Sequence, residues 1–210
     1  MKISEEQLRL YAVTDSSWLR GKTLGQSVRE AILGGATIVQ YREKRLSVPA
    51  QLAQAREVRE VCREYGVPFI MNDSVEMALT LDADGVHLGL DDGDIAKARQ
   101  ILGDDKIIGA STHNAQEAIA AQAQGADYLG CGAVFGSTTK TNVRPITPEI
   151  LREVTSSVSI PVVAIGGINR ENIAKLRGCD LAGVAVVSAL FAQKDITAAA
   201  REMLALAERL

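Results

Sequence analysis

A short apolar run, then a polar loop, then a segment with helical periodicity recurs along this chain about every 20–25 residues. Amphipathic stretches such as LGQSVREAILGG and NAQEAIAAQAQG separate the apolar runs. The eight apolar runs are LYAVTD, TIVQYRE, PFIMND, GVHLGL, KIIGAS, YLGCGAVF, PVVAIGG and GVAVVSA. Strands that alternate with helices imply βαβ units and a parallel sheet. Eight such units in 210 residues predict an α/β fold, a (β/α)8 TIM barrel, with residues 1–210 as one domain.

An open, doubly wound sheet is the alternative fold for such a pattern. That fold commonly begins with a G-x-G-x-x-G turn after its first strand. No such turn follows LYAVTD here, so the barrel is the better interpretation.

Composition and charge exclude several classes of protein. The formal net charge of −3 gives no general attraction to nucleic acid or to an anionic membrane, so any anion site must be local. No apolar run approaches the roughly 20 residues of a membrane span, and the first residues lack an apolar signal region. Cys62, Cys131 and Cys179 are expected to be small buried side chains in a reducing compartment. We therefore expect a cytoplasmic protein that binds no nucleic acid and no membrane.

The chemistry of a TIM barrel lies at the carboxyl ends of its strands. At the second strand end, Gln40, Arg42 and Lys44 alternate, so in an extended chain they point the same way. A polar, cationic row at the carboxyl end of a strand indicates that the opening of the barrel, its mouth, binds an anion. The alternative is a solvated strand end with both cations in water.

The next two strand ends carry acidic residues. Asn72 and Asp73 end the third strand, and Asp91 and Asp92 follow the fourth. Because these strand tips are neighbours, Asp73 and one of the later pair could share a divalent cation such as Mg²⁺. The alternative is a solvated acidic loop with Asp94 as a helix N-cap.

Hydroxyl groups follow the fifth and sixth strands. Ser111 could donate to a phosphate or a ring, whereas Thr112 and Asn114 are better explained as helix caps. The loop GSTTK, residues 136–140, combines hydroxyls with an ammonium group and could grip a phosphate, or could be an ordinary hydrophilic loop. His87 and His113 are expected to have structural or solvent-facing roles.

The last two strand ends favour a second anion site. Gly166 and Gly167 would let the backbone approach a ligand, and helices starting near Asn169 and Ala189 would direct N–H groups at an anion. A strongly cationic site and a milder one in the same mouth suggest an enzyme that joins two phosphorylated substrates. Spacing alone does not name them.

This chain resembles the thiamine phosphate synthase family in segments that occur in the same order over essentially its whole length. The matching segments are LYAVTD, VQYREK, FIMND, GVHLG, IIGAST, TTKT, AIGGI and GVAVVSAL. The resemblance implies a transferase of thiamine biosynthesis. Such an enzyme condenses 4-amino-2-methyl-5-hydroxymethylpyrimidine diphosphate with 4-methyl-5-(2-phosphoethyl)thiazole, or with its carboxylated form. The products are thiamine phosphate and diphosphate, formed by a dissociative, Mg²⁺-assisted route through a pyrimidine-methyl cation.

The resemblance also implies roles for residues at the matching positions. The pyrimidine diphosphate would contact Gln40, Tyr41, Arg42, Glu43, Lys44, Asn72, Ser111 and Lys140, of which Arg42, Lys44 and Lys140 would be catalytic. The thiazole phosphate would contact Ser137, Thr138, Thr139, Gly167, Val187 and Ser188. One Mg²⁺ per subunit would be held by Asp73 and Asp92, because the family's aspartate lies five residues after His87.

Some positions depart from the family pattern. Leu90 stands where the family often has Gln, and Ala133 and Gly136 stand where it often has proline. These departures weaken the expectation of a rigid sixth loop and of a further contact to the metal aspartate. The role of Trp18, after the first strand, stays open, as does the oligomeric state, with a homo-oligomer as one option.

Three other functions fit parts of the pattern. A thiazole tautomerase would need an acid/base residue but no diphosphate site. A non-catalytic barrel that senses a phosphorylated metabolite would have little use for converging aspartates. A phosphosugar isomerase or epimerase would need a carboxylate or lysine beside a carbonyl, and the sequence offers no clear pair.

Overall fold

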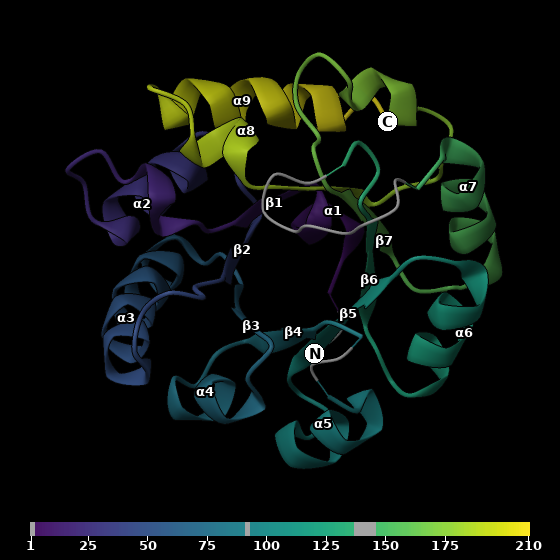
Figure 1. The fold of residues 1–210 in the computed structure, drawn as a ribbon, viewed down its shortest axis with the longest axis horizontal. Coiled ribbons are helices and arrows are strands. Elements are labelled where there is room, and N and C mark those ends of the chain that lie inside the picture. Colours follow the sequence, from purple (N-terminus) through teal and green to yellow (C-terminus); the bar gives the residue numbers. More distant parts are fainter. Residues whose placement is uncertain (1–2, 91–92, 137–145) are drawn as a thin grey trace.

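Eight parallel strands close into a barrel in the order of the sequence, and helices surround it (Figure 1). The structure, a computed structural model, describes residues 3–90, 93–136 and 146–210. The strands are β1 (Leu10–Val13), β2 (Ile38–Tyr41), β3 (Phe69–Asn72), β4 (Gly85–Leu88), β5 (Ile107–Thr112), β6 (Tyr128–Gly132), β7 (Val162–Ile165) and β8 (Gly183–Val186). Seven of them lie within one of the apolar runs, and β5 extends one residue beyond its run, to Thr112, so the predicted TIM barrel is confirmed.

Most of the helices start where a short polar side chain accepts a backbone N–H. The longer ones are α2 (Leu24–Leu33), α3 (Val48–Tyr65), α5 (Ile95–Leu102), α6 (Ala115–Ala123), α7 (Pro148–Ser157) and α9 (Ile196–Ala207). The shorter ones are α1 (Glu5–Leu8), η1 (Ser16–Trp18), α4 (Val75–Thr80), η2 (Ile173–Leu176) and α8 (Ser188–Phe191). Asp94 accepts from the Lys97 N–H and Asn114 from the Glu117 N–H, as expected of N-caps. The helices α3, η2 and α8 have no such cap.

One expected helix start and one expected helix cap are wrong. No helix begins at Asn169, because Asn172 holds a turn there: its Oδ1 accepts from the Asn169 N–H at 2.8 Å and its Nδ2 donates to the Gly167 carbonyl at 2.9 Å. The short helix η2 starts only at Ile173. Thr112 is the last residue of β5 and caps nothing, since Asn114 has that role.

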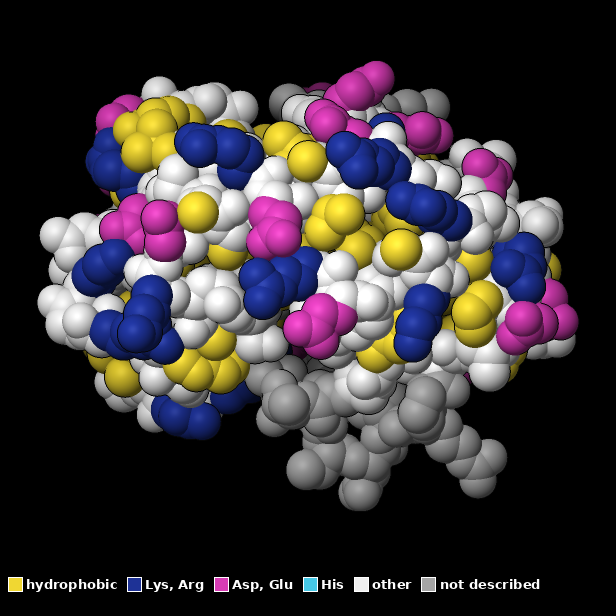
Figure 2. All heavy atoms as spheres, turned by 90° about the horizontal axis from the view of Figure 1, so that it is seen from above, with side chains coloured by type: hydrophobic (Ala, Val, Ile, Leu, Met, Phe, Trp, Pro, Cys, Tyr) yellow, Lys and Arg dark blue, Asp and Glu magenta, His cyan; other side chains and the backbone are white. Residues whose placement is uncertain are grey.

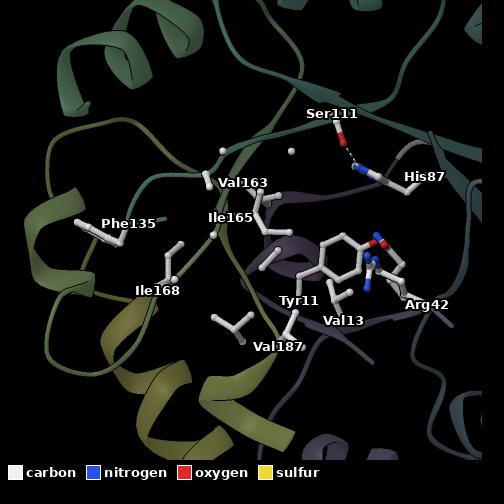
Figure 3. A pocket seen from close by; sticks show the side chains of 18 of the residues that line it. Tyr11, Val13, Arg42, His87, Ser111, Phe135, Val163, Ile165, Ile168 and Val187 are labelled. Atoms are coloured by element: carbon white, nitrogen blue, oxygen red, sulfur yellow. Dashed lines mark hydrogen bonds between the residues drawn. The ribbon is translucent and has the colours of Figure 1, made fainter. Parts of the chain in front are cut away.

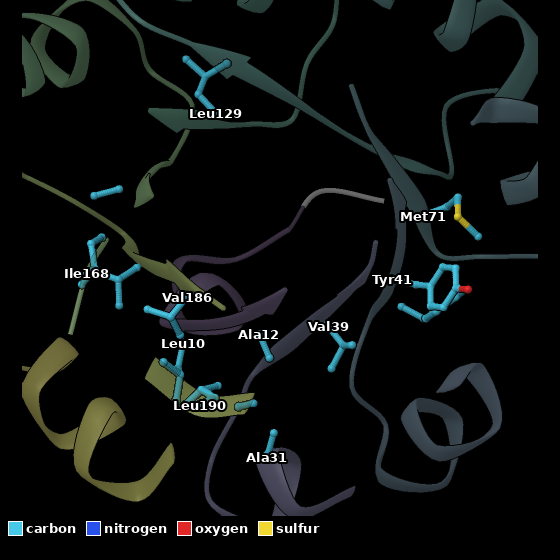
Figure 4. Packing of buried hydrophobic residues seen from close by; sticks show 14 of the residues in the cluster. Leu10, Ala12, Ala31, Val39, Tyr41, Met71, Leu129, Ile168, Val186 and Leu190 are labelled. Carbon is cyan, nitrogen blue, oxygen red and sulfur yellow. The ribbon is translucent and has the colours of Figure 1, made fainter. Parts of the chain in front are cut away.

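The core has two layers, separated by the sheet. Leu10, Ala12 and Val39 point outward against the helices, and the packing of this outer layer is shown in Figure 4. Tyr11, Val13, Ile38, Ile70, Ile107, Tyr128 and Val163 fill the barrel interior. Both faces of each strand are therefore buried, which explains why the strands appear in the sequence as continuous apolar runs.

The cysteines are buried and unbridged, as expected. All three, Cys62, Cys131 and Cys179, are free thiols. Burial raises the pKa of Cys62 to about 12 and that of Cys131 to about 11. These two thiols are therefore poor nucleophiles at neutral pH.

The surface mixes charges of both signs. On the face shown in Figure 2, basic and acidic side chains lie close together among small hydrophobic areas. Within the described ranges, no helix is both long enough and apolar enough to cross a membrane.

Side chains at the amino end of the barrel connect neighbouring strands. Thr37 Oγ1, before β2, accepts from the Leu10 N–H at 3.0 Å. Asp84 Oδ2, before β4, accepts from the Phe69 N–H at 2.8 Å. In the same way Asp127, before β6, accepts from the backbone at the start of β5. Polar groups at this end of the barrel thus stabilise the fold and leave the opposite end for chemistry.

Within the described residues, Asp127 differs from the other two because it also forms an ion pair. Its Oδ2 accepts from the Ile108 N–H at 2.8 Å and from Arg99 Nη2 at 2.6 Å. Arg99, on α5, also donates to the carbonyls of Gly103, Lys106 and Gly125. One ion pair therefore ties the loops before β5 and β6 together.

Replacing this carboxylate should cost stability without changing the mouth. We predict that Asp127→Asn lowers the free energy of unfolding by about 2 kcal/mol, because it weakens two charge-assisted bonds to a partly buried group. Urea unfolding measures the change. The exposed Asp105 provides the control, since Asp105→Asn should shift the value by less than ~0.5 kcal/mol. An Asp127→Asn protein as stable as its parent would contradict this role.

Candidate active site

A pocket of about 350 Å³ opens at the carboxyl ends of the strands. It is large enough for a small organic ligand. Its lining comes from most of the strand ends and from the loops that follow β6, β7 and β8. Figure 3 shows Arg42, His87 and Ser111 on one side of the pocket and Ile165, Ile168 and Val187 on the other. The pocket therefore has one polar wall and one apolar wall.

The polar wall contains four of the residues predicted to meet the pyrimidine diphosphate: Gln40, Arg42, Asn72 and Ser111. Gln40 is only 4% exposed and lies in the barrel interior. The Arg42 backbone is fixed by the buried Thr14, whose Oγ1 accepts the Arg42 N–H at 2.9 Å. β1 thereby determines where the end of β2 lies.

Lys44 and Asp73 meet at the edge of this wall. Lys44 Nζ lies 2.5 Å from Asp73 Oδ2, with the Lys44 side chain 54% exposed and that of Asp73 21% exposed. The backbone of Asp73 is left-handed, at φ 65°, and its N–H donates to the His87 carbonyl at 2.9 Å. Aspartate tolerates this conformation at a cost of order 1 kcal/mol, and such strain is concentrated at functional sites. The turn places a carboxylate beside a cation at the mouth.

Tyr41 and Glu43 lie differently from their neighbours. Tyr41 is in the outer layer, and its hydroxyl donates to Gln54 Oε1 on α3 at 3.1 Å, so its side chain is not part of the pocket lining. Glu43 accepts from the N–H groups of Lys44 and Arg45 at 2.8 and 2.7 Å. Burial opposes ionisation of Glu43, but hydrogen bonds from the Ser16 hydroxyl and those two N–H groups outweigh it and lower its pKa. Glu43 therefore stays a carboxylate that shapes the turn after β2.

The floor of the pocket is polar where a TIM barrel is usually filled by branched apolar side chains. The hydroxyls of Tyr11 and Tyr128 lie 2.7 Å apart, with the two rings in an edge-to-face arrangement. His87 connects Tyr128 to Ser111, since its Nδ1 lies 3.0 Å from the Tyr128 hydroxyl and its Nε2 lies 3.0 Å from Ser111 Oγ. Glycines make room for these rings, since a Cβ on Gly109 would lie 2.1 Å from Tyr128 Cζ and one on Gly130 3.1 Å from His87 Cε1.

The apolar wall ends in exposed backbone. Gly167 and Ser188, both predicted to meet the thiazole phosphate, line the pocket together with Val187. The backbone of Gly167 is left-handed, at φ 66°, and a Cβ there would lie 2.6 Å from the Phe135 carbonyl oxygen. Only glycine fits this position without displacement of the loop after β6.

Several predicted residues lie outside the described part of the chain. These are Asp92, Ser137, Thr138, Thr139 and Lys140. Of the positions that depart from the family pattern, Leu90 is exposed and Ala133 lines the pocket. Trp18, in η1, packs against the outer core layer. It is not part of the pocket lining.

The floor of the pocket was not predicted from the sequence. His87, expected to have a structural or solvent-facing role, lines the pocket and touches Ser111. His113 lines the pocket as well, and its Nδ1 also makes a structural contact, 3.0 Å from Glu117 Oε2 on α6. A signal for the floor was present: Tyr11 has the parity of an interior position, and a buried tyrosine hydroxyl needs a hydrogen-bond partner.

The donor set at Asp73 suits a hard divalent cation. Among the residues that the structure describes, no three histidine, cysteine, aspartate or glutamate side chains gather into a metal site. Mg²⁺ needs only one or two carboxylates when substrate phosphate and water complete its shell. Asp73 can supply one of them, so the residues fit Mg²⁺ with a substrate oxygen as a further ligand.

Together, the fold and pocket define a TIM-barrel protein with a partly cationic pocket at the carboxyl ends of its strands, and comparisons with known proteins narrow this class. Residues 10–190 match the family described as thiamine monophosphate synthase. The chain is 49% identical to the thiamine-phosphate synthase of Chloroflexus aurantiacus over 94% of its own length and 92% of that protein. It is 47% identical to that of Clostridium novyi over 93% of its length and 96% of that protein.

A solved structure agrees with these relatives. Thiamine phosphate pyrophosphorylase from Pyrococcus furiosus superposes with a TM-score of 0.88 at 41% identity, covering 97% of each chain. The chain belongs to the thiamine monophosphate synthase family. The family expected from the sequence is therefore confirmed.

Proposed function

We propose that this protein is a transferase that joins the pyrimidine diphosphate and the thiazole phosphate to give thiamine phosphate and diphosphate. The observation that carries the proposal is the two-walled pocket at the strand ends, in a chain of this family. A polar, cationic wall suits a charged leaving group, and an apolar wall suits an aromatic thiazole. The cytoplasmic location expected from the sequence stays a prediction.

The pyrimidine diphosphate would lie against β2, β3 and β5. Gln40 and Ser111 would hold the ring, and Asn72 would approach it from β3. The diphosphate would extend toward Arg42 and Lys44, where Glu43 holds the turn and Tyr41 anchors the strand from outside. Lys140 would complete this set.

The thiazole phosphate would lie against β7 and β8. The ring would contact Ile165 and Val187, and the phosphate would meet the Gly167 backbone and Ser188. Ser137, Thr138 and Thr139 would supply further hydroxyls. In this arrangement the two rings face each other across the pocket, as a coupling reaction requires.

Mg²⁺ would be held by Asp73 and Asp92 together with substrate oxygens. When bound, it would neutralise part of the charge on the diphosphate and so make diphosphate a better leaving group. Lys44, now paired with Asp73, would be free to turn to the diphosphate once the cation shares that carboxylate.

The reaction needs little proton transfer. The C–O bond to diphosphate breaks, its electron pair leaves with diphosphate, and the pyrimidine amino group stabilises the resulting methyl cation. The thiazole nitrogen then donates its lone pair to that carbon, so no group has to be deprotonated. Arg42, Lys44 and Lys140 would offset the charge that grows on the leaving group. The apolar wall would keep water from the cation.

The activity test uses both substrates with the purified protein. We expect thiamine phosphate, detected by fluorescence after oxidation to the thiochrome, with Mg²⁺ and not with EDTA. Product that is unaffected by EDTA would contradict the metal assignment. Binding of the thiazole phosphate without product would favour the tautomerase or the sensor.

Lys140 should contribute mainly to the rate. We predict that Lys140→Ala slows turnover by ~100- to 1,000-fold, because a preorganised positive group at the leaving group is lost. Lys106→Ala is the matched control: Lys106 precedes β5 at the opposite end of the barrel, where its Nζ lies 2.7 Å from Asp82. Steady-state kinetics measure both variants. An unchanged rate in Lys140→Ala would remove Lys140 from the mechanism.

A further inference from the structure

Five side chains form a continuous row of hydrogen bonds beneath the pocket. Gln40 Nε2 lies 3.0 Å from the Tyr11 hydroxyl, which lies 2.7 Å from the Tyr128 hydroxyl. The row continues to His87 Nδ1 at 3.0 Å and from His87 Nε2 to Ser111 Oγ at 3.0 Å. It crosses the barrel from β2 to β5 through residues on β1, β6 and β4. We call it the floor row.

The floor row joins two residues that line the pocket, Gln40 and Ser111, through side chains that water hardly reaches. Tyr11 is 1% exposed, Tyr128 0% and His87 9%. Burial raises the pKa of both tyrosines well above the usual value, so each hydroxyl keeps its single proton at neutral pH. Each can then donate only once, which couples the direction of neighbouring bonds.

The donor at the end of the row, together with the need of each buried hydroxyl proton for an acceptor, favours one direction for the other hydrogen bonds. Gln40 Nε2 can only donate, so the Tyr11 hydroxyl accepts from it. The Tyr128 hydroxyl, 2.7 Å away, is then the acceptor for the Tyr11 proton, because a buried hydroxyl proton needs a partner. Donation to His87 Nδ1 then satisfies the buried Tyr128 proton, and it requires that nitrogen to carry no proton. The proton of the neutral ring is on Nε2 and is donated to Ser111 Oγ.

This direction determines what the two ends offer to a ligand. With its Nε2 bonded to Tyr11, Gln40 has its carbonyl oxygen available as an acceptor. With its Oγ accepting from His87, Ser111 has its hydroxyl hydrogen available as a donor. Both residues line the pocket. An aminopyrimidine has the complementary pattern, because its amino group donates and its ring nitrogens accept.

We propose that Tyr11 and Tyr128 are positioning residues that fix Gln40 as an acceptor and Ser111 as a donor, and so select an amino-substituted over an oxo-substituted pyrimidine. An oxo ring carries a carbonyl in place of the amino group and a proton on a ring nitrogen, so it would meet Gln40 and Ser111 with the wrong partners. The inference rests on the proposed function for the identity of the ligand. The direction of the hydrogen bonds in the floor row does not depend on the proposed function.

The direction can be measured without any ligand. The chain has only two histidines, so a ¹⁵N spectrum of the labelled side chains is simple to assign, with His113→Gln identifying the second ring. We expect His87 to be neutral at pH 7, with its proton on Nε2 and none on Nδ1. A proton on Nδ1, in a neutral or a charged ring, would reverse the bond to Tyr128 and overturn the proposal.

The selectivity is tested by binding. Calorimetry with Mg²⁺ and without thiazole compares the 4-amino pyrimidine diphosphate with its 4-oxo counterpart. We expect the parent protein to prefer the amino compound by roughly 10- to 100-fold, the factor that a mispaired buried polar group produces. Tyr128→Phe, which removes one hydroxyl and keeps the ring, should lose most of this preference and change the His87 spectrum.

Tyr65→Phe is the matched control. The Tyr65 hydroxyl accepts from Arg29 on the outside of the barrel, so this variant should keep both the preference and the spectrum. A tyrosine with a merely structural role would weaken both ligands equally, so an unchanged ratio in folded Tyr128→Phe would overturn the proposal. Equal affinity of the parent protein for the amino and the oxo compound would also overturn the proposal. A parent protein that binds neither compound would instead contradict the proposed function.

Discussion

Closure of the sheet by the pairing of β1 with β8 brings the described residues that line the pocket together at one end of the barrel. Tyr11 lies opposite Ala185 in that pairing, and the other strands follow in sequence order. Because all strands run the same way, their carboxyl ends meet at one mouth although the residues there come from distant parts of the chain. Gln40 and Ser188 line the same pocket for this reason. No local feature of the sequence could bring them together.

The two ends of the barrel have different polar chemistry. At the amino end, the carboxylates of Asp84 and Asp127 accept hydrogen bonds from backbone N–H groups, and that of Asp127 also accepts one from Arg99. At the carboxyl end, Arg42 lines the pocket and Lys44 is half exposed, so both can reach a ligand. Substitutions at the first end should therefore act on stability and those at the second on binding and rate.

The fold could be predicted from the sequence because it depends on a periodic pattern that every unit repeats. The positions of Gln40 and Asn72 at the strand ends could also be predicted, since parity places alternate residues on one side of a strand. The floor row could not be predicted, because the contacts of Tyr11, His87 and Tyr128 join three strands whose relative rotation no local pattern specifies. The outward position of Tyr41 does follow from that same parity once β2 is fixed.

The most direct measurement of the central claim is a crystal structure of the protein grown with thiamine phosphate, diphosphate and Mg²⁺. We expect the pyrimidine over the floor row, with its amino group against the Gln40 carbonyl oxygen. We expect the thiazole against Ile165 and Val187, and diphosphate with the metal beside Lys44 and Asp73. A product turned the other way round in the pocket, or bound outside it, would contradict the proposed site.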